Sequence, residues 1–342
     1  MEVTKVPVLR LPQHLPHAEA IRSFKDNQHS YEAEFWEYQY QTYRYLERLS
    51  EESLITRYAD ILKNMQALIS EDRHVIPIQS FLSSWYWFRK EHQTRFEFYL
   101  RGLKLPSPAP LDITFNNVEI GAVVRPKHPN SGDVLFRYDK QVHLDGIANL
   151  GVIRIQPASN FQDYDHNSAR QDEEQSKKHY LPGGYTRITT ENGASIPIIG
   201  DVERMVTMPN YYIFCMSCDW DQGLFSDFDG DACLIIKNVE EFSRRLECAA
   251  TSHLAGWYFH HNPVQYFDPY ERTKNEYLEA TMSKDFRFAY QREYRFLWFP
   301  QNGEEPNGFK FLDLGSLSDF AEVRAQQVAP ADLGSATLHQ DV

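Results

Sequence analysis

The chain has 342 residues, of which 42% are hydrophobic and 14% aromatic, so it has length for about two domains and too much apolar surface for a disordered protein. Its net charge of −13 excludes a generally basic surface for non-specific nucleic-acid binding, and any such contact has to use a local basic patch. There is no apolar run of membrane-helix length and no pattern of a secretory signal, and the four cysteines are too few for a disulfide framework. We expect a cytoplasmic protein that makes no use of a membrane.

The first part of the chain, residues 1–110, has the spacing of a helical domain. Apolar side chains recur every three to four residues in three stretches. These stretches are residues 31–49, 54–68 and 78–103. Gly102 and Pro106 predict the end of the third helix, and the proline-rich segment 106–110 predicts a stiff connector. We place the domain boundary at this connector.

The third predicted helix carries the clearest basic patch of an acidic chain. Its cations are Arg89, Lys90, Arg95, Arg101 and Lys104, against Glu91 and Glu97. A helix with an excess of one charge is either a solvated face or a surface for a charged partner. Arg89, Lys90 and Arg95 are therefore candidate target-binding residues, and a solvated face is the alternative.

Beyond residue 110 the hydrophobic period changes toward two, which indicates strands. Strands are expected over residues 113–124, 133–138, 152–156, 196–199, 211–218, 232–236, 263–267 and 286–299, and helices over 142–150, 239–255 and 272–284. Residues 325–342 lack a hydrophobic pattern and are expected to form a flexible tail. The sequence thus predicts an α+β fold, in which the N-terminal helical domain precedes a mainly β domain at 111–324.

The sequence lacks the common nucleotide and metal motifs. Neither glycine-rich nucleotide fingerprint is present. Cys215 and Cys218 have CxxC spacing, but they lie on a predicted strand, where residues three apart point to opposite faces. The segment 227–238 begins like a calcium loop but lacks the glycine and the final glutamate of such a loop. We expect no metal site.

Residues 286–299 alternate like one long strand. Aromatic side chains would share its core face, whereas Gln291 and Glu293 would project from the other face beside Arg287 and Arg295. Such a polar row has to meet water or a polar cleft, because burying it without partners is costly. A solvent-facing surface with a weak ion pair and a functional cleft both stay open.

The Gln291-Arg-Glu293 segment resembles the last of three short motifs of the ADP-ribosyltransferase superfamily. The superfamily also has an Arg or His on a first strand and a Ser- or Tyr-bearing motif on a middle strand. Arg137-Tyr138 and Phe214-Cys-Met-Ser217 resemble these motifs and occur in the same order. The middle segment differs from many members because it lacks a Ser-Thr-Ser triplet.

Residues 146–163, which include Asn160 and Phe161, also resemble a family of bacterial phage-defence and abortive-infection proteins. In that family a helix, a strand and an Asn-Asp-type loop follow the Arg-Tyr pair. The resemblance extends over about residues 130–300 and leaves out the helical front.

The resemblance implies a split-sheet, ADP-ribosyltransferase-like catalytic domain and an enzyme with NAD as its substrate. Glu293 would stabilise the positive charge on the ribose as nicotinamide leaves, as a carboxylate does in glycoside cleavage. Arg137 would bind the pyrophosphate with its planar fork. Ser217 would brace Glu293 or the nicotinamide ribose, and Gln291 would orient the acceptor.

The resemblance also assigns the ring that stacks on nicotinamide to one of several aromatic side chains. Tyr138, Phe161 and Tyr290 remain alternatives for this role. Tyr138, Asn160 and Phe161, together with Arg137, form the expected NAD-binding set.

The expected function is that of a bacterial toxin or antiviral effector that transfers ADP-ribose from NAD to a macromolecule. The defence-like resemblance and the basic helix favour RNA as the acceptor, and a protein acceptor is the alternative. A neutralising antitoxin protein is a possible partner of such a toxin. A module of the same fold that binds a nucleotide or a partner without catalysis is the alternative from another class, since fold does not fix function.

Overall fold

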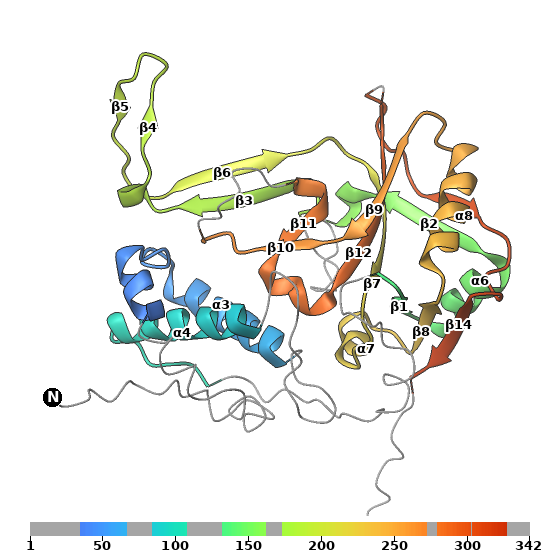
Figure 1. Cartoon of the computed structure of the whole chain (residues 1–342), viewed down its shortest axis with the longest axis horizontal. Coiled ribbons are helices and arrows are strands. Elements are labelled where there is room, and N and C mark those ends of the chain that lie inside the picture. The colour runs from blue at the N-terminus through green and yellow to red at the C-terminus, as the bar shows by residue number, and fades with distance from the viewer. Residues whose placement is uncertain are drawn as a thin grey trace, which may run out of the picture.

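The computed structural model describes residues 35–66, 84–107, 132–161, 173–271, 279–301 and 303–326. It contains helices and antiparallel sheets, which confirms the α+β class at that level (Figure 1). The predicted strand 113–124, most of the connector after Pro106 and nearly all of the predicted tail lie outside the described residues.

Two long helices, α3 (Glu51–Gln66) and α4 (Ser84–Leu100), form the helical layer at the lower left of Figure 1. The Ser50 hydroxyl accepts a hydrogen bond from the Ser53 amide at 3.0 Å, so it caps the start of α3. Gly102 has a positive φ of 65° directly after α4, as expected for a glycine at a helix end. The first predicted helix ends earlier than expected, because the helix gives way to turns after residue 42.

The larger sheet has eight strands. They are β1 (Leu135–Asp139), β2 (Val152–Pro157), β7 (Tyr212–Ser217), β8 (Ala232–Ile236), β9 (Tyr258–Pro263), β12 (Glu293–Phe299), β13 (Lys310–Asp313) and β14 (Ala321–Ala325). The order is β13-β2-β7-β1-β8-β14, with β12 paired to both β7 and β9. Strands β9, β13 and β14 have no counterpart among the strands expected from the sequence.

Strand β7 has two different edges. One edge pairs with β12 over six residue pairs, from Glu293–Ser217 to Trp298–Tyr212. The other edge pairs with β2 at Ile213 and with β1 at Ser217, so these two neighbours meet β7 near its opposite ends. Strands β1 and β2 therefore diverge along the middle of β7.

Helices α6 (Gln141–Leu150) and α8 (Val239–Thr251) cover one face of the sheet, at the right of Figure 1. A hydrophobic cluster that includes Leu144, Phe242, Phe214 and Phe296 fills the space between these helices and the strands. Gly151 ends α6 with a φ of 71°, and a Cβ at this position would collide with the Gly315 carbonyl. Both helices agree with the sequence prediction to within a few residues.

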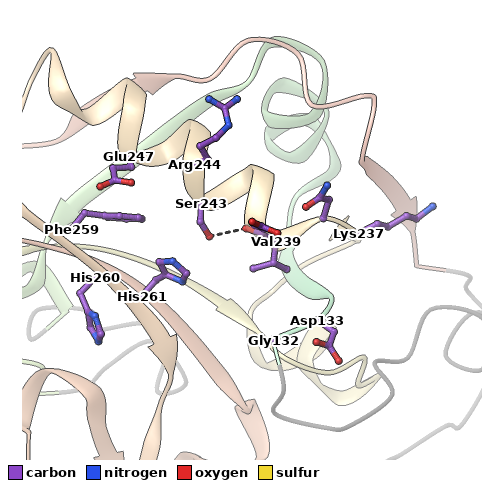
Figure 2. Close-up of a pocket in the computed structure, with 12 residues that line it drawn as sticks. Gly132, Asp133, Lys237, Val239, Ser243, Arg244, Glu247, Phe259, His260 and His261 are labelled. Atoms are coloured by element: carbon purple, nitrogen blue, oxygen red, sulfur yellow. Dashed lines mark hydrogen bonds between the residues drawn. The ribbon is translucent and has the colours of Figure 1, made fainter.

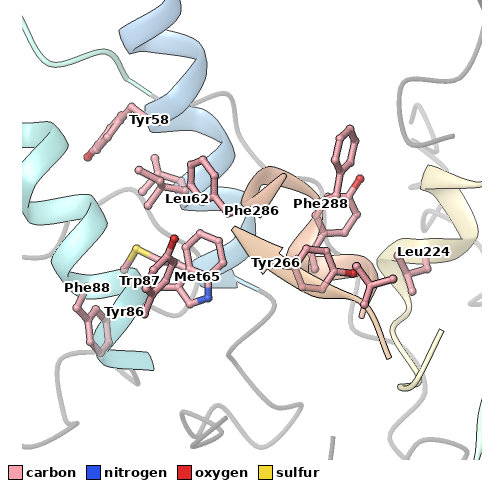
Figure 3. Packing of buried hydrophobic residues seen from close by; sticks show 14 of the residues in the cluster. Tyr58, Leu62, Met65, Tyr86, Trp87, Phe88, Leu224, Tyr266, Phe286 and Phe288 are labelled. Atoms are coloured by element: carbon pink, nitrogen blue, oxygen red, sulfur yellow. The ribbon is translucent and has the colours of Figure 1, made fainter. Parts of the chain in front are cut away.

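Short elements cover the other face. They are η1 (Ala158–Phe161), α7 (Gly223–Asp227), β10 (Gln265–Phe267), η3 (Ala280–Met282), β11 (Ser283–Asp285) and η4 (Phe286–Gln291). Trp87 of α4 stacks on Phe286 of η4 with 5.7 Å between ring centroids, and Leu62 of α3 belongs to the same cluster (Figure 3). Asn64 donates to the Arg287 carbonyl at 2.9 Å. The helical layer and the segment before β12 thus share one hydrophobic core.

The prediction of one strand over 286–299 was wrong. Residues 286–291 form the 3-10 helix η4, Arg292 has a φ of 44°, and β12 begins at Glu293. The alternating pattern was misleading because Phe286, Phe288 and Tyr290 are all buried in the hydrophobic cluster that η4 shares with the helical layer, rather than on a face of the sheet. The helix predicted over 272–284 is wrong where it is described, since η3 and β11 occupy its end.

A two-stranded arm projects from the fold at the upper left of Figure 1. It pairs β3 (Ser176–Leu181) with β6 (Val202–Thr207), and η2 (Gly183–Tyr185) leads to a short hairpin of β4 (Ile188–Thr189) and β5 (Ser195–Ile196). Only the first residue of the strand predicted over 196–199 is part of a strand. No helix within the described ranges is long and apolar enough to cross a membrane.

Candidate functional site

A cavity of about 390 Å³ lies where β1 and β2 diverge along β7. The candidate residues that line it are Arg137, Tyr138, Phe161, Ser217, Gln291 and Glu293. Asn160 is not among the lining residues. Three segments that are far apart in sequence, on β1, β7 and the η4–β12 junction, therefore bring the main candidate residues to one cavity.

Glu293 lies at the buried end of this cavity, where β12 starts beside Ser217 of β7. Its Oε1 accepts from Arg295 Nε at 2.6 Å and its Oε2 accepts from Lys284 Nζ at 2.7 Å. Burial by itself would raise the pKa of Glu293, but Arg295 and Lys284 lower it more, so the net pKa lies below the ordinary value. The carboxylate is therefore ionised and held on both oxygens, and the interpretation of a solvent-facing Glu293–Arg295 pair was wrong.

Gln291 and Glu293 come together through a turn and not through strand alternation. Arg292 lies between them with a left-handed backbone and forms an ion pair with Asp219. Lys284 Nζ donates to Gln291 Oε1 at 3.0 Å as well as to Glu293. The two side chains thus share one cation, whereas Arg287, which was expected beside them, is exposed.

Arg137 reaches into the gap between β1 and β2. Its Nη1 donates to the Cys215 carbonyl at 2.7 Å, and its Cζ lies 4.5 Å from the centre of the Phe214 ring. Asp139 is 3.9 Å from Nη2, with both side chains part-exposed, so this ion pair contributes little energy. The sheet thus places a guanidinium at the wall of the cavity.

Ser217 braces backbone atoms. Its Oγ lies 2.7 Å from the Gln291 carbonyl oxygen and 3.1 Å from the Asp219 carbonyl oxygen. Ser217 therefore holds the turn that carries Gln291 and Glu293.

The three aromatic candidates have different environments. Tyr138 lines the cavity, but its hydroxyl bonds the Asp219 carbonyl and the Asp221 amide, and its ring packs edge-on against Phe225 at 4.9 Å. Tyr290 is buried beneath Lys63, whose Nζ lies 3.9 Å above the ring, and it does not line the cavity. Phe161 lines the cavity and is only partly buried.

The predicted basic patch is internal at one position only: Lys90 is buried, whereas Arg89 and Arg95 are part-exposed. Lys90 is 0% exposed and contacts Asp268 at 2.5 Å and Glu271 at 2.7 Å. Arg89 pairs with Glu271, and Arg95 pairs with Glu91. The expectation that Lys90 belongs to an exposed cationic surface was wrong, because Lys90 is buried against Asp268 and Glu271 from a distant part of the chain.

Six further polar or charged residues that line the cavity were not predicted as site residues. They are Asp139, His143, Arg154, Gln156, Glu174 and Lys284. Arg295 Nη2 donates to Glu174 at 2.8 Å, so a second buried carboxylate is linked to Glu293 through Arg295. Lys284 and Glu174 each lie outside the recognised motifs, and a single sequence carries no signal that Lys284 contacts Glu293 or that Arg295 links Glu174 to it.

A second, shallow pocket lies beside α8 and β9 (Figure 2). Its polar side chains include Lys237, Arg244 and His260, and Ser243 within it donates to the Val239 carbonyl at 2.7 Å. None of the predicted site residues lines it. In the part of the chain that the structure describes, no cluster of three or more His, Cys, Asp or Glu side chains could hold a metal ion.

Comparison of the chain with protein-family models, with curated proteins and with solved structures finds no match.

Proposed function

We propose that this protein is an ADP-ribosyltransferase that uses NAD as the donor substrate. The observation that supports the proposal is the convergence of Glu293, Arg137 and Ser217 on one cavity at the divergence of β1 and β2. Each of the three residues belongs to one of the three short sequence motifs, and they lie on separate segments of the chain.

In this proposal Glu293 stabilises the positive charge that develops on the ribose. Cleavage of the bond between nicotinamide and ribose develops positive charge on the ribose, and a fixed anion stabilises that charge without reorganising. Glu293 is ionised, buried and held by Arg295 and Lys284. Its carboxylate oxygens keep further lone pairs for a ribose hydroxyl, since a carboxylate has about four acceptor sites.

The diphosphate of NAD has suitable partners on both sides of the gap. Arg137 of β1 and Arg154 of β2 line the same cavity. A guanidinium binds two phosphate oxygens at once, which fixes orientation as well as charge. Phe161 and Phe311 provide apolar walls at this cavity for the flat rings of the dinucleotide.

Helix α4 does not favour RNA over protein as the acceptor, because Lys90 is buried and its neighbours Arg89 and Arg95 are paired with acids. The experiment therefore tests RNA and protein acceptors side by side. A role in defence against phage stays part of the proposal through the resemblance of residues 146–163.

The test is release of nicotinamide and transfer of label from NAD carrying a radioactive adenylate. Purified protein is incubated with this NAD and, in separate arms, total RNA, a protein lysate or buffer alone. Label in the RNA or protein arm identifies the acceptor class, and release in buffer alone identifies hydrolysis. Absence of nicotinamide release in all arms, with NAD still bound, would favour the binding-module alternative.

A substitution at Glu293 links the activity to this site. Glu293→Gln keeps the shape of the side chain and removes its charge, so it should lower the rate of nicotinamide release by about a thousandfold. Glu247→Gln, at an exposed position in the second pocket, is the control and should retain full activity. Circular dichroism of both variants checks that the fold is retained. A folded Glu293→Gln variant with near-normal activity would disprove the assignment.

A further inference from the structure

Lys284 has an unusual position for a lysine. It is 4% exposed and lines the cavity, and it comes from β11, which pairs with β10 and is not a strand of the larger sheet. Removing an ammonium group from water is expensive, and a buried charge is tolerated when well-placed partners replace its hydration. These partners are Gln291 Oε1 at 3.0 Å and Glu293 Oε2 at 2.7 Å.

The geometry points to Lys284 as the positioning residue that locks Gln291 and Glu293 into one unit. This inference rests on the proposed function, because Glu293 is the residue proposed to stabilise the ribose. An ammonium group only donates hydrogen bonds, so its contact with Gln291 fixes which end of that amide is the oxygen. The Gln291 amide nitrogen is thereby turned away from Lys284, toward the Tyr290 hydroxyl at 3.4 Å.

Lys284 and Arg295 each bind one carboxylate oxygen of Glu293, and they have different positions relative to the cavity. Arg295 is 0% exposed, does not line the cavity, and binds Glu293, the Thr281 carbonyl and Glu174. It is therefore the fixed outer anchor. Lys284 lies on the cavity side and is the cation that joins Glu293 to the second candidate residue.

The charge state of Glu293 depends on all groups that face it. These groups are Lys284 of β11, Arg295 of β12, Glu174 before β3, Tyr266 of β10, Cys215 of β7 and Cys218 after β7. Lys284 and Arg295 are the cations in direct contact. Loss of Lys284 removes one of them and raises the pKa of Glu293, so ionisation of the carboxylate shifts to higher pH.

The experiment compares Lys284→Met with Lys177→Met. Lys177 is also a 4% exposed lysine, but it donates to the Glu173 carbonyl at 2.8 Å and does not line the cavity, so it is a matched control for loss of a buried ammonium. Lys284→Met should lower kcat for nicotinamide release at least about tenfold through misplacement of Glu293. The acid limb of its pH–rate profile should move to higher pH. Lys177→Met should show neither effect.

A second readout does not depend on activity. In protein labelled with carbon-13 at the glutamate carboxyl, the Glu293 resonance is identified by its absence in Glu293→Gln. Its titration midpoint should rise in Lys284→Met, stay unchanged in Lys177→Met, and return toward the wild-type midpoint in Lys284→Arg, which restores a cation.

Folded Lys284→Met protein with an unchanged Glu293 midpoint and an unchanged kcat would overturn the inference. An equal shift in Lys177→Met would also overturn it, since the effect would then be general. A wild-type chain that never releases nicotinamide would refute the proposed function instead, and the carboxyl titration would still decide whether Lys284 controls Glu293.

Discussion

The guanidinium of Arg137 donates a hydrogen bond to the main-chain carbonyl of Cys215, 2.7 Å away, at the place where β1 separates from β7. Cys215 lies between Ile213, which faces β2, and Ser217, which faces β1. A side chain thus supplies a hydrogen bond that a neighbouring strand would supply in a continuous sheet. Arg137 has a structural role at the cavity wall in addition to its proposed contact with the diphosphate.

Substitution of Arg137 should separate these two roles. Arg137→Ala should raise KM for NAD at least about tenfold, because a charge-assisted contact of 1.5–3 kcal/mol is about one or two powers of ten. Arg137→Lys should give an intermediate KM, since lysine keeps the charge but loses the planar fork. Arg204→Ala, on the exposed arm, serves as the control. An unchanged KM in folded Arg137→Ala would place the diphosphate elsewhere.

Arg292 gives a prediction about backbone strain. Its φ of 44° favours glycine, and its side chain forms a buried ion pair with Asp219. Both Arg292→Ala and Arg292→Gly lose the ion pair, but only alanine keeps the strain. Arg292→Ala should therefore be less stable than Arg292→Gly by roughly 1 kcal/mol in urea unfolding.

The opposite order is expected at Arg244, an exposed residue inside α8, where glycine is less stable than alanine by about 1 kcal/mol. If Arg292 follows the same order as Arg244, the left-handed turn between Gln291 and Glu293 is not present in solution.

The ion pairs of Asp268 make the stability of the protein depend on pH. It accepts two hydrogen bonds from Arg57, at 3.0 and 2.6 Å, and contacts Lys90. Burial by itself would raise the pKa of Asp268, but Arg57 and Lys90 lower it more, so the net pKa lies below the ordinary 3.8. A carboxylate with a depressed pKa contributes stability above its ordinary pKa, and this stability is lost as the pH falls toward the folded-state pKa.

Asp268→Asn should lower the free energy of unfolding by about 3–5 kcal/mol at neutral pH, because two buried cations lose their anion. The remaining pH dependence below about pH 4 should be flatter than in the wild type. Asp229→Asn is the control: this side chain is 85% exposed, and asparagine tolerates its positive φ of 52°. Chemical denaturation at pH 7 and pH 3 measures both effects.

Phe286 tests the contact between the helical layer and η4. It is 3% exposed and stacks on Trp87, and Arg57 Cζ lies 4.7 Å from its ring centre. Phe286→Ala should lower the free energy of unfolding by about 3–5 kcal/mol. Phe35→Ala, at a 51% exposed ring, should change it by about 0.5 kcal/mol or less. Similar losses in both variants would contradict the packing described here.

The sequence was informative where local patterns decide the structure. The periodicity of residues 54–68 and 239–255 predicted α3 and α8, and Gly102 predicted the end of α4. It failed at residues 286–291, because the alternation of aromatic residues there reflects burial in a hydrophobic cluster shared with α3 and α4, which are distant in the chain. Short strands such as β13 and β14 also depend on pairing with distant partners.

The same distinction applies to the site. Arg137, Ser217 and Glu293 could be chosen from short motifs, and all three line one cavity. Lys284 could not be chosen, because its role depends on a contact between β11 and the start of β12 that no local pattern encodes. Likewise the charges on α4 looked like a free basic face, since Asp268 and Glu271 lie about 180 residues further along the chain.

The aromatic core shared by the helices and η4 bears on how deletion variants are designed. Among the described residues, those that line the cavity run from Phe136 to Phe311, which invites the use of a fragment that starts at residue 111 in assays. Such a fragment would leave Phe286 without Trp87 and would remove Leu62 and Asn64 from beside η4. Loss of activity in such a truncated protein would then reflect disruption of the structure near Gln291 and Glu293 rather than loss of a recognition domain. Point substitutions on the outer surface of α3 and α4 are therefore the sounder way to ask what those helices bind.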